Sequence, residues 1–175
     1  MRPIFLTLLF SFPLSVLATD PILPDPTLTP GAVFTNVTVE QITQKGYANV
    51  INGGVRNVPT SVRHAAFVEY FKSVPPSGHA QGNGPRRSGD YEVDHLISLE
   101  LGGSNDIKNL WPESYFSVPW NSHVKDRLED WMAASVRHTL KDQGHDAATA
   151  LLKQYQHEIS TDWIAAYQKY ISTSP

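Results

Sequence analysis

The residues best able to do chemistry lie in one stretch, between Tyr91 and Pro112. An acid and an imidazole, Asp94 and His95, stand together at the end of a strand-like run, and Asn109 follows after a Gly-Gly turn. A carboxylate is a ligand that hard divalent cations prefer. An imidazole, with an ordinary pKa of about 6.5, can accept a proton from water at neutral pH. Such groups together can bind a metal and activate water, which is the chemistry of phosphodiester hydrolysis.

The elements around these residues must bring them to one place. Successive side chains on a strand point to opposite faces, so the strand has to end or twist at Asp94 and His95 if both are to meet one phosphate. The Gly102-Gly103 turn allows the chain to return locally. Asn109 can then hydrogen-bond the backbone across the loop and hold the strand that carries the imidazole.

A second set of polar residues surrounds this stretch. Asn121 and Lys125 open a helix at a spacing of four residues and therefore share one face of it. Asn121 offers a carbonyl oxygen to a metal, and Lys125 is a candidate phosphate contact, although an exposed helix lysine is the more common explanation. Arg86 and Arg87 lie in a loop rich in glycine and proline, where they are either a solvated loop tip or a further phosphate contact.

This order of residues resembles the HNH endonuclease family. The resemblance extends from Glu92 to Arg127 and is most specific between Asp94 and Trp111. It implies a ββα-metal fold, in which two strands and a helix surround one divalent ion. The residues that carry it, in chain order, are Asp94-His95, Gly102-Gly103, Asn109-Leu110-Trp111, and Asn121 with Lys125.

The resemblance also implies a role for each residue. His95 and Asn109 are the candidate catalytic residues, His95 as the general base and Asn109 as the residue that orients the loop and the base. Asp94 and Asn121 are the candidate metal ligands, with His123 as the alternative to Asn121. The implied cofactor is Mg²⁺, with Mn²⁺ or Zn²⁺ as alternatives. Many members of the family also carry zinc-binding cysteines, whereas this chain has none, so helical packing must replace them.

The N-terminal sequence predicts export. A basic start, an uncharged apolar run and small residues up to Ala18 are typical of a signal peptide over residues 1–18. A membrane anchor is the alternative, but the run is short and contains Pro3 and Pro13. We therefore expect a secreted or periplasmic protein that does not associate with the membrane after the signal is removed.

The charge of the chain limits how it can bind nucleic acid. Fourteen Lys and Arg residues face 17 Asp and Glu residues, for a formal net charge of −3. A protein that reads DNA sequence is normally basic. We therefore expect local contacts and little sequence preference.

The rest of the chain predicts a single α+β domain over residues 36–175, with a core motif at about 91–127. Residues 19–35 contain four prolines and predict an extended tether. Short elements are expected at 39–43, as a helix, and at 55–58, as a strand, followed by a helix capped by Thr60.

The C-terminal part is expected to be mostly helical. Apolar residues recur at helical spacing over 124–140, 151–155 and 159–170, which predicts three helices packed on the strand unit. Gly144 closes the first helix and Asp146 caps the second.

Together these features lead to the hypothesis of an exported, metal-dependent endonuclease that cuts nucleic acid, with DNA as the expected substrate. The alternative is a non-catalytic exported module that binds nucleic acid or metal on the same scaffold, which the negative net charge favours. A small zinc-binding protein that uses His95 and His123 is a third hypothesis.

Overall fold

The computed structural model describes residues 22–49, 56–81 and 85–171. The predicted signal peptide, residues 1–18, lies outside the described residues. In the described part, no helix has the length and apolar character needed to cross a membrane.

The strand unit is an antiparallel hairpin of β1 (Tyr91–His95) and β2 (Leu110–Ser114). Tyr91 pairs with Ser114, and His95 pairs with Leu110. The first strand therefore ends at the Asp-His pair. A loop with 3₁₀ turns at Leu99–Leu101 and Ile107–Asn109 connects the two strands.

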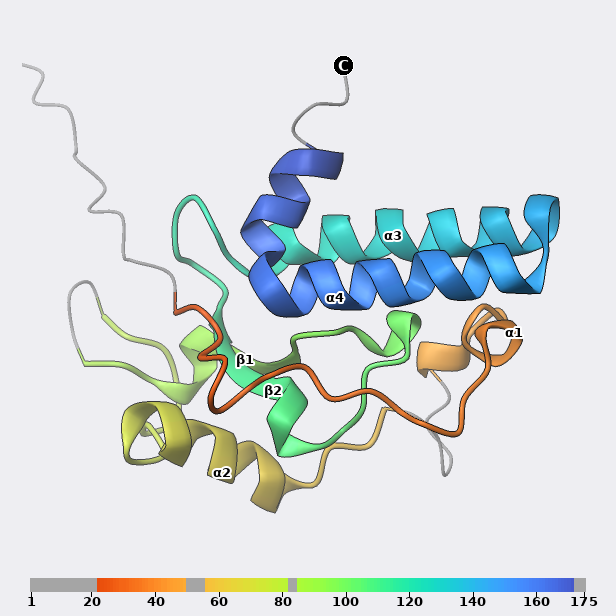
Figure 1. Ribbon diagram of the computed structural model, residues 1–175. Coiled ribbons are helices and arrows are strands. Elements are labelled where there is room, and N and C mark those ends of the chain that lie inside the picture. The colour runs from red at the N-terminus through yellow and green to blue at the C-terminus, as the bar shows by residue number, and fades with distance from the viewer. Residues whose placement is uncertain (1–21, 50–55, 82–84, 172–175) are drawn as a thin grey trace, which may run out of the picture.

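Helices cover both sides of this hairpin (Figure 1). The long helices α3 (Ser122–Gln143) and α4 (His145–Tyr170) lie antiparallel on one side, and α2 (Thr60–Phe71) lies on the other. The short helix α1 (Val39–Ile42) packs against α4 and begins with a capping box between Thr38 and Gln41. The described residues are thus a mixed fold of helices and a small two-stranded sheet, which confirms the α+β prediction at this level.

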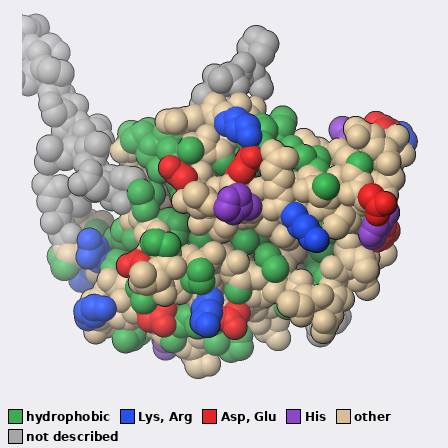
Figure 2. Space-filling model, in the orientation of Figure 1, with side chains coloured by type: hydrophobic (Ala, Val, Ile, Leu, Met, Phe, Trp, Pro, Cys, Tyr) green, Lys and Arg blue, Asp and Glu red, His purple; other side chains and the backbone are tan. Residues whose placement is uncertain are grey.

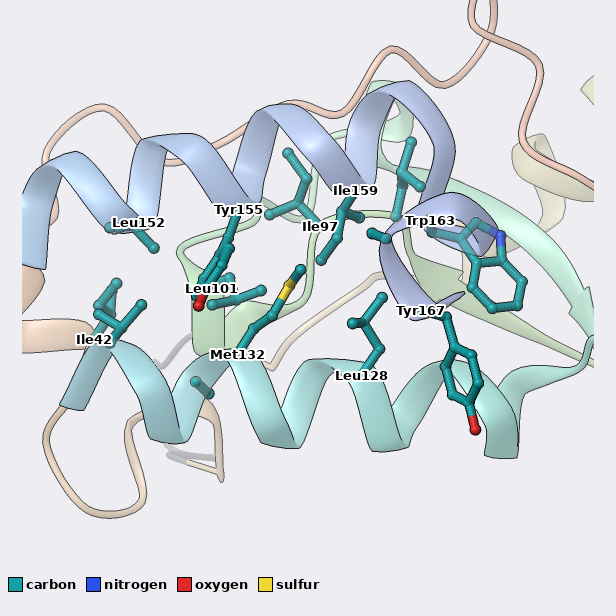
Figure 3. Close-up of a cluster of buried hydrophobic side chains, with 14 of the residues drawn as sticks. Ile42, Ile97, Leu101, Leu128, Met132, Leu152, Tyr155, Ile159, Trp163 and Tyr167 are labelled. Carbon is teal, nitrogen blue, oxygen red and sulfur yellow. The ribbon is translucent and has the colours of Figure 1, made fainter. Parts of the chain in front are cut away.

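The core lies between the helix pair and the loop of the hairpin (Figure 3). Apolar side chains from α3 and α4 face one another and enclose two side chains of the loop, Ile97 and Leu101. The helix residues at its centre are Leu128, Met132, Leu152, Tyr155 and Ile159. The same core therefore fixes both the long helices and the loop that follows His95.

Two of the expected elements are wrong in detail. Residues 56–58 form no strand, so the strand predicted over 55–58 is not present in its described part. The second and third predicted C-terminal helices both form within α4 (His145–Tyr170), but the break between them lies at Asp162, where the backbone is extended (φ −163°, ψ 94°), and not between residues 155 and 159. The Asp162 carboxylate accepts a hydrogen bond from the Ala165 N–H, so it caps the helical piece beyond the break.

The segment predicted as a tether is part of the domain from Ile22 onward. The Thr29 side chain is fully buried, and its hydroxyl donates to the Leu110 carbonyl at 3.1 Å. Further along, the Gly31 and Phe34 N–H groups donate to the loop at Lys108 and Gly102, each at 2.9 Å. Prolines exclude a helix here, but they do not prevent an extended chain from bonding to a loop far away in sequence.

Candidate functional site

The site is built on the last two residues of β1. Asp94 Oδ2 contacts Lys125 on α3, whereas His95 Nε2 contacts Asn105 in the loop between the strands. The two neighbouring side chains therefore leave the strand in different directions, as the alternation of a strand requires.

Asn109 braces the loop behind His95. Its side chain is fully buried, and its Oδ1 accepts the Ile97 N–H at 2.9 Å. Its Nδ2 donates to the carbonyls of Ile97, at 2.9 Å, and Ser104, at 3.0 Å. The backbone carbonyl of Asn109 also accepts the Leu96 N–H at 2.8 Å. These contacts are those of a residue that orients the loop, which is the role that the sequence predicts for Asn109.

Gly103 permits this close approach of loop and strand. A Cβ at this position would lie 1.7 Å from the Ile97 carbonyl oxygen and 2.8 Å from Asn109 Nδ2. Any other residue at position 103 would therefore displace the backbone after His95.

His95 is held in one tautomer. Its side chain is nearly buried, and Nε2 lies 2.8 Å from the Oδ1 of Asn105. A carboxamide oxygen can only accept, so Nε2 carries the hydrogen and the neutral ring keeps its lone pair at Nδ1. Burial lowers the pKa of His95 below its usual value, in spite of the opposing effects of Asn105 and Asp94. The ring is therefore neutral at neutral pH and can accept a proton at Nδ1.

Asp94 is paired with a buried lysine. Lys125 is 1% exposed, and its Nζ donates to Asp94 Oδ2 at 2.7 Å and to the His95 carbonyl at 2.7 Å. It also donates to the carboxylate of Glu129, one helical turn further on. Burial by itself would raise the pKa of Asp94, but the Lys125 ammonium outweighs it and holds the pKa below its usual value.

Two further carboxyl groups adjoin this pair. Glu113, on β2, is 2% exposed, and burial together with the charge of Asp94 raises its pKa well above the usual value. Burial likewise raises the pKa of Glu129 to about 8. Neither oxygen of Glu113 receives a donor from the described residues.

The predicted helix ligands are engaged elsewhere. Asn121 is the N-cap of α3: its Oδ1 accepts the Val124 N–H at 3.1 Å, and its Nδ2 donates to the Ser117 carbonyl at 2.9 Å. His123 is exposed and packs on Tyr115, with 5.9 Å between the ring centroids.

These contacts test the expected metal site. One oxygen of Asp94 is bound to an ammonium, and the carboxamide oxygen of Asn121 is bound to the helix cap. Among the residues that the structure describes, no three His, Asp or Glu side chains are grouped so that they could hold a metal ion. As arranged here, the predicted donors do not fit a divalent ion.

The predicted phosphate contacts do not form one surface. Lys125 is buried, which disagrees with the expectation that it contacts phosphate. Arg86 is exposed and lies 4.9 Å above the Phe71 ring, and the Arg87 N–H donates to Asp90 at 3.0 Å. On the face shown in Figure 2, basic side chains are scattered among acidic ones and form no continuous stripe.

Three residues of the site were not predicted from the sequence. Glu129 lies four residues after Lys125, so the helical spacing of an ion pair was a usable signal. Asn105 and Glu113 carry no such signal. Their places beside His95 and Asp94 depend on the path of the loop and on the register of the hairpin.

Comparisons of the chain with protein-family models, with curated proteins and with solved structures find no match. The resemblance to HNH endonucleases therefore rests on the residues quoted above.

Proposed function

We propose that this protein is an endonuclease of the HNH type, which hydrolyses phosphodiester bonds in nucleic acid with little sequence preference. DNA is the proposed substrate. The observation that supports the proposal most is the neutral His95 at the end of β1, held by Asn105, with the loop behind it braced by Asn109. The order strand, loop, strand and helix around it is the order that the resemblance implies.

His95 acts as the general base in this proposal. The lone pair at Nδ1 takes a proton from the attacking water, while Asn105 holds the opposite edge of the ring. A well-placed base contributes roughly 10²–10⁴-fold to the rate. Removal of the imidazole should therefore abolish detectable cutting.

The proposed cofactor is the divalent ion that the resemblance implies, Mg²⁺ with Mn²⁺ or Zn²⁺ as alternatives. Asp94 and Asn121 have other partners here, so cutting is measured both with and without metal. The proposed place of action is outside the cytoplasm, in the periplasm or the medium, on the basis of the predicted signal peptide.

A second function is a non-catalytic module that binds nucleic acid or metal on the same scaffold. The specific observation in its favour is the pairing of Asp94 with Lys125, which neutralises the carboxylate next to the proposed base. The third hypothesis, zinc binding by His95 and His123, gains no support, since the described contacts of the two rings lead to different partners, Asn105 and Tyr115.

A nicking assay separates these functions. The protein without residues 1–18 is incubated with supercoiled plasmid in Mg²⁺ or Mn²⁺, with and without EDTA. We expect wild type to nick the plasmid only when metal is present, and His95→Ala to lose at least about 100-fold of this activity.

The matched control is His138→Ala, which removes an exposed histidine of α3 and should cut like wild type. Both variants should keep the circular-dichroism signal of the helices. A wild-type protein that binds plasmid but never nicks it identifies the binding module, and unchanged cutting by His95→Ala rules out His95 as the base.

A further inference from the structure

The contacts of Lys125 show which cation lies beside Asp94: the ammonium of Lys125 itself. We infer that Asp94 serves as the counter-ion of Lys125 instead of a metal ligand, and that this pair positions His95. The pairing does not depend on the proposed function, whereas the positioning of His95 as a base rests on it.

The first argument is that the ammonium is fully satisfied. An ammonium has three N–H donors. Lys125 has three acceptors, namely the carboxylates of Asp94 and Glu129 and the backbone carbonyl of His95. Its side chain is 1% exposed, so no water is needed to complete the set.

The second argument concerns charge. A divalent ion on the other oxygen of Asp94 would lie next to the Lys125 ammonium, and the two cations would repel each other strongly away from bulk water. The Glu129 carboxyl is already bound to Lys125, so it is not available as a ligand that would offset this repulsion.

The third argument concerns position. Lys125 Nζ bonds to the side chain of Asp94 and also to the backbone carbonyl of His95, at 2.7 Å. The lysine also lies over the Trp111 ring, with its Nζ 5.1 Å from the centroid. Trp111 is the cross-strand partner of Asp94. One side chain thus connects α3 to both strands where the proposed base leaves β1.

A metal titration tests the first half of the inference. Mn²⁺ is added to the protein that lacks residues 1–18, and the concentration of free Mn²⁺ is measured by electron paramagnetic resonance. Wild type is compared with Asp94→Asn, which keeps the shape of the side chain, and with the control Asp142→Asn, which changes an exposed acid of α3.

We expect Asp94→Asn to bind Mn²⁺ as wild type does, within about twofold, or both to bind none. Loss of a true ligand weakens metal binding by about tenfold or more, since even outer-shell changes cost 10- to 100-fold. A tenfold or larger loss in Asp94→Asn, with Asp142→Asn unchanged, would overturn the inference.

The second half is tested by the ¹⁵N resonances of the His95 imidazole, which report the tautomer. We expect wild type to show Nε2 protonated and Nδ1 free, and Lys125→Met to show averaged shifts. Lys141→Met, which removes an exposed lysine of the same helix, should match wild type. Wild-type shifts in a folded Lys125→Met would overturn the positioning role.

Neither measurement reads DNA cleavage. A protein that never cuts DNA would refute the proposed function and still leave both results interpretable. If Lys125→Met does not fold, the ¹⁵N resonances of His95 in Asp94→Asn test the positioning role, because that variant removes the charge of the same pair. Wild-type shifts in Asp94→Asn would then overturn it.

Discussion

His95 differs from an ordinary exposed histidine in two properties. It is nearly buried, and one ring nitrogen is committed to Asn105. Burial disfavours the charged imidazolium, and the hydrogen bond selects which nitrogen keeps the lone pair. A residue prepared in this way is unprotonated at neutral pH, with its lone pair at Nδ1.

The lowered pKa of His95 should appear in the pH dependence of stability. Its pKa is about 6.5 in the unfolded chain and lower in the folded one. The unfolded state therefore binds more protons between these two values, so the free energy of unfolding falls as the pH drops below about 6.5. We expect wild type to lose stability more steeply than His95→Gln between about pH 7 and 5, as measured by urea unfolding. Parallel curves would contradict the lowered pKa.

Asn109 should be one of the most costly polar residues to remove. Asn109→Ala leaves the Ile97 N–H and the carbonyls of Ile97 and Ser104 without their partners in the interior. Each unsatisfied buried group costs about 1–3 kcal/mol, so we expect a loss of at least ~3 kcal/mol in the free energy of unfolding. The exposed Asn57→Ala is the control and should change stability by no more than about 0.5 kcal/mol. Equal losses in the two variants would mean that Asn109 does not brace the loop.

At the scale of elements, the loop between β1 and β2 is as important as the strands. It contributes Ile97 and Leu101 to the core, and it turns back on itself at Gly102 and Gly103. The hairpin, with only five residues in each strand, depends on this packed loop and on the helices around it.

Gly103→Ala tests the fit of this loop. The new methyl group would overlap the Ile97 carbonyl oxygen, so the backbone has to move. Gly46→Ala is the matched control: it has a left-handed backbone (φ +81°) but open space around it, and should cost about 1–2 kcal/mol.

We expect Gly103→Ala to cost more than Gly46→Ala in urea unfolding, because its methyl group overlaps backbone atoms, whereas Gly46→Ala only strains a left-handed position. It should also disturb the His95 resonances, which Gly46→Ala should not do. A Gly103→Ala protein as stable as the control would show that the loop can relax without loss.

At the scale of the whole molecule, the first described residues tie the layers together. In Figure 1 this segment, red to orange, crosses the hairpin in the view and then turns up to α1. It bonds to the loop at Lys108 and Gly102 and to β2 at Leu110. Its removal would expose the edge of the core as well as break these bonds.

A pair of truncations measures this contribution. We expect a chain that begins at Asn36 to be less stable by ~3 kcal/mol or more than one that begins at Ile22, because at least three interior hydrogen bonds are lost. The midpoint of urea unfolding and the near-ultraviolet circular dichroism report the change. Identical midpoints would mean that residues 22–35 add no stability, as expected of a tether.

Much of the local structure follows from the sequence. The helical spacing after Trp120 predicts α3, which Asn121 was expected to open. The strand-like run ending at His95 predicts β1, and the place of Asn109 after the Gly-Gly turn predicts its role in the loop. These features were predictable because each depends on residues close together in the chain.

Only the tertiary structure determined which groups neutralise one another and which segments are buried. Lys125 and Asp94 are 31 residues apart, and Thr29 and Leu110 are 81 residues apart. The sequence showed a lysine on a helix face and a proline-rich segment, and both patterns are usually found in solvent. In the structure Lys125 and Thr29 are buried. A charged or backbone polar group that is removed from water needs a partner within the protein, and the fold determines which group that partner is.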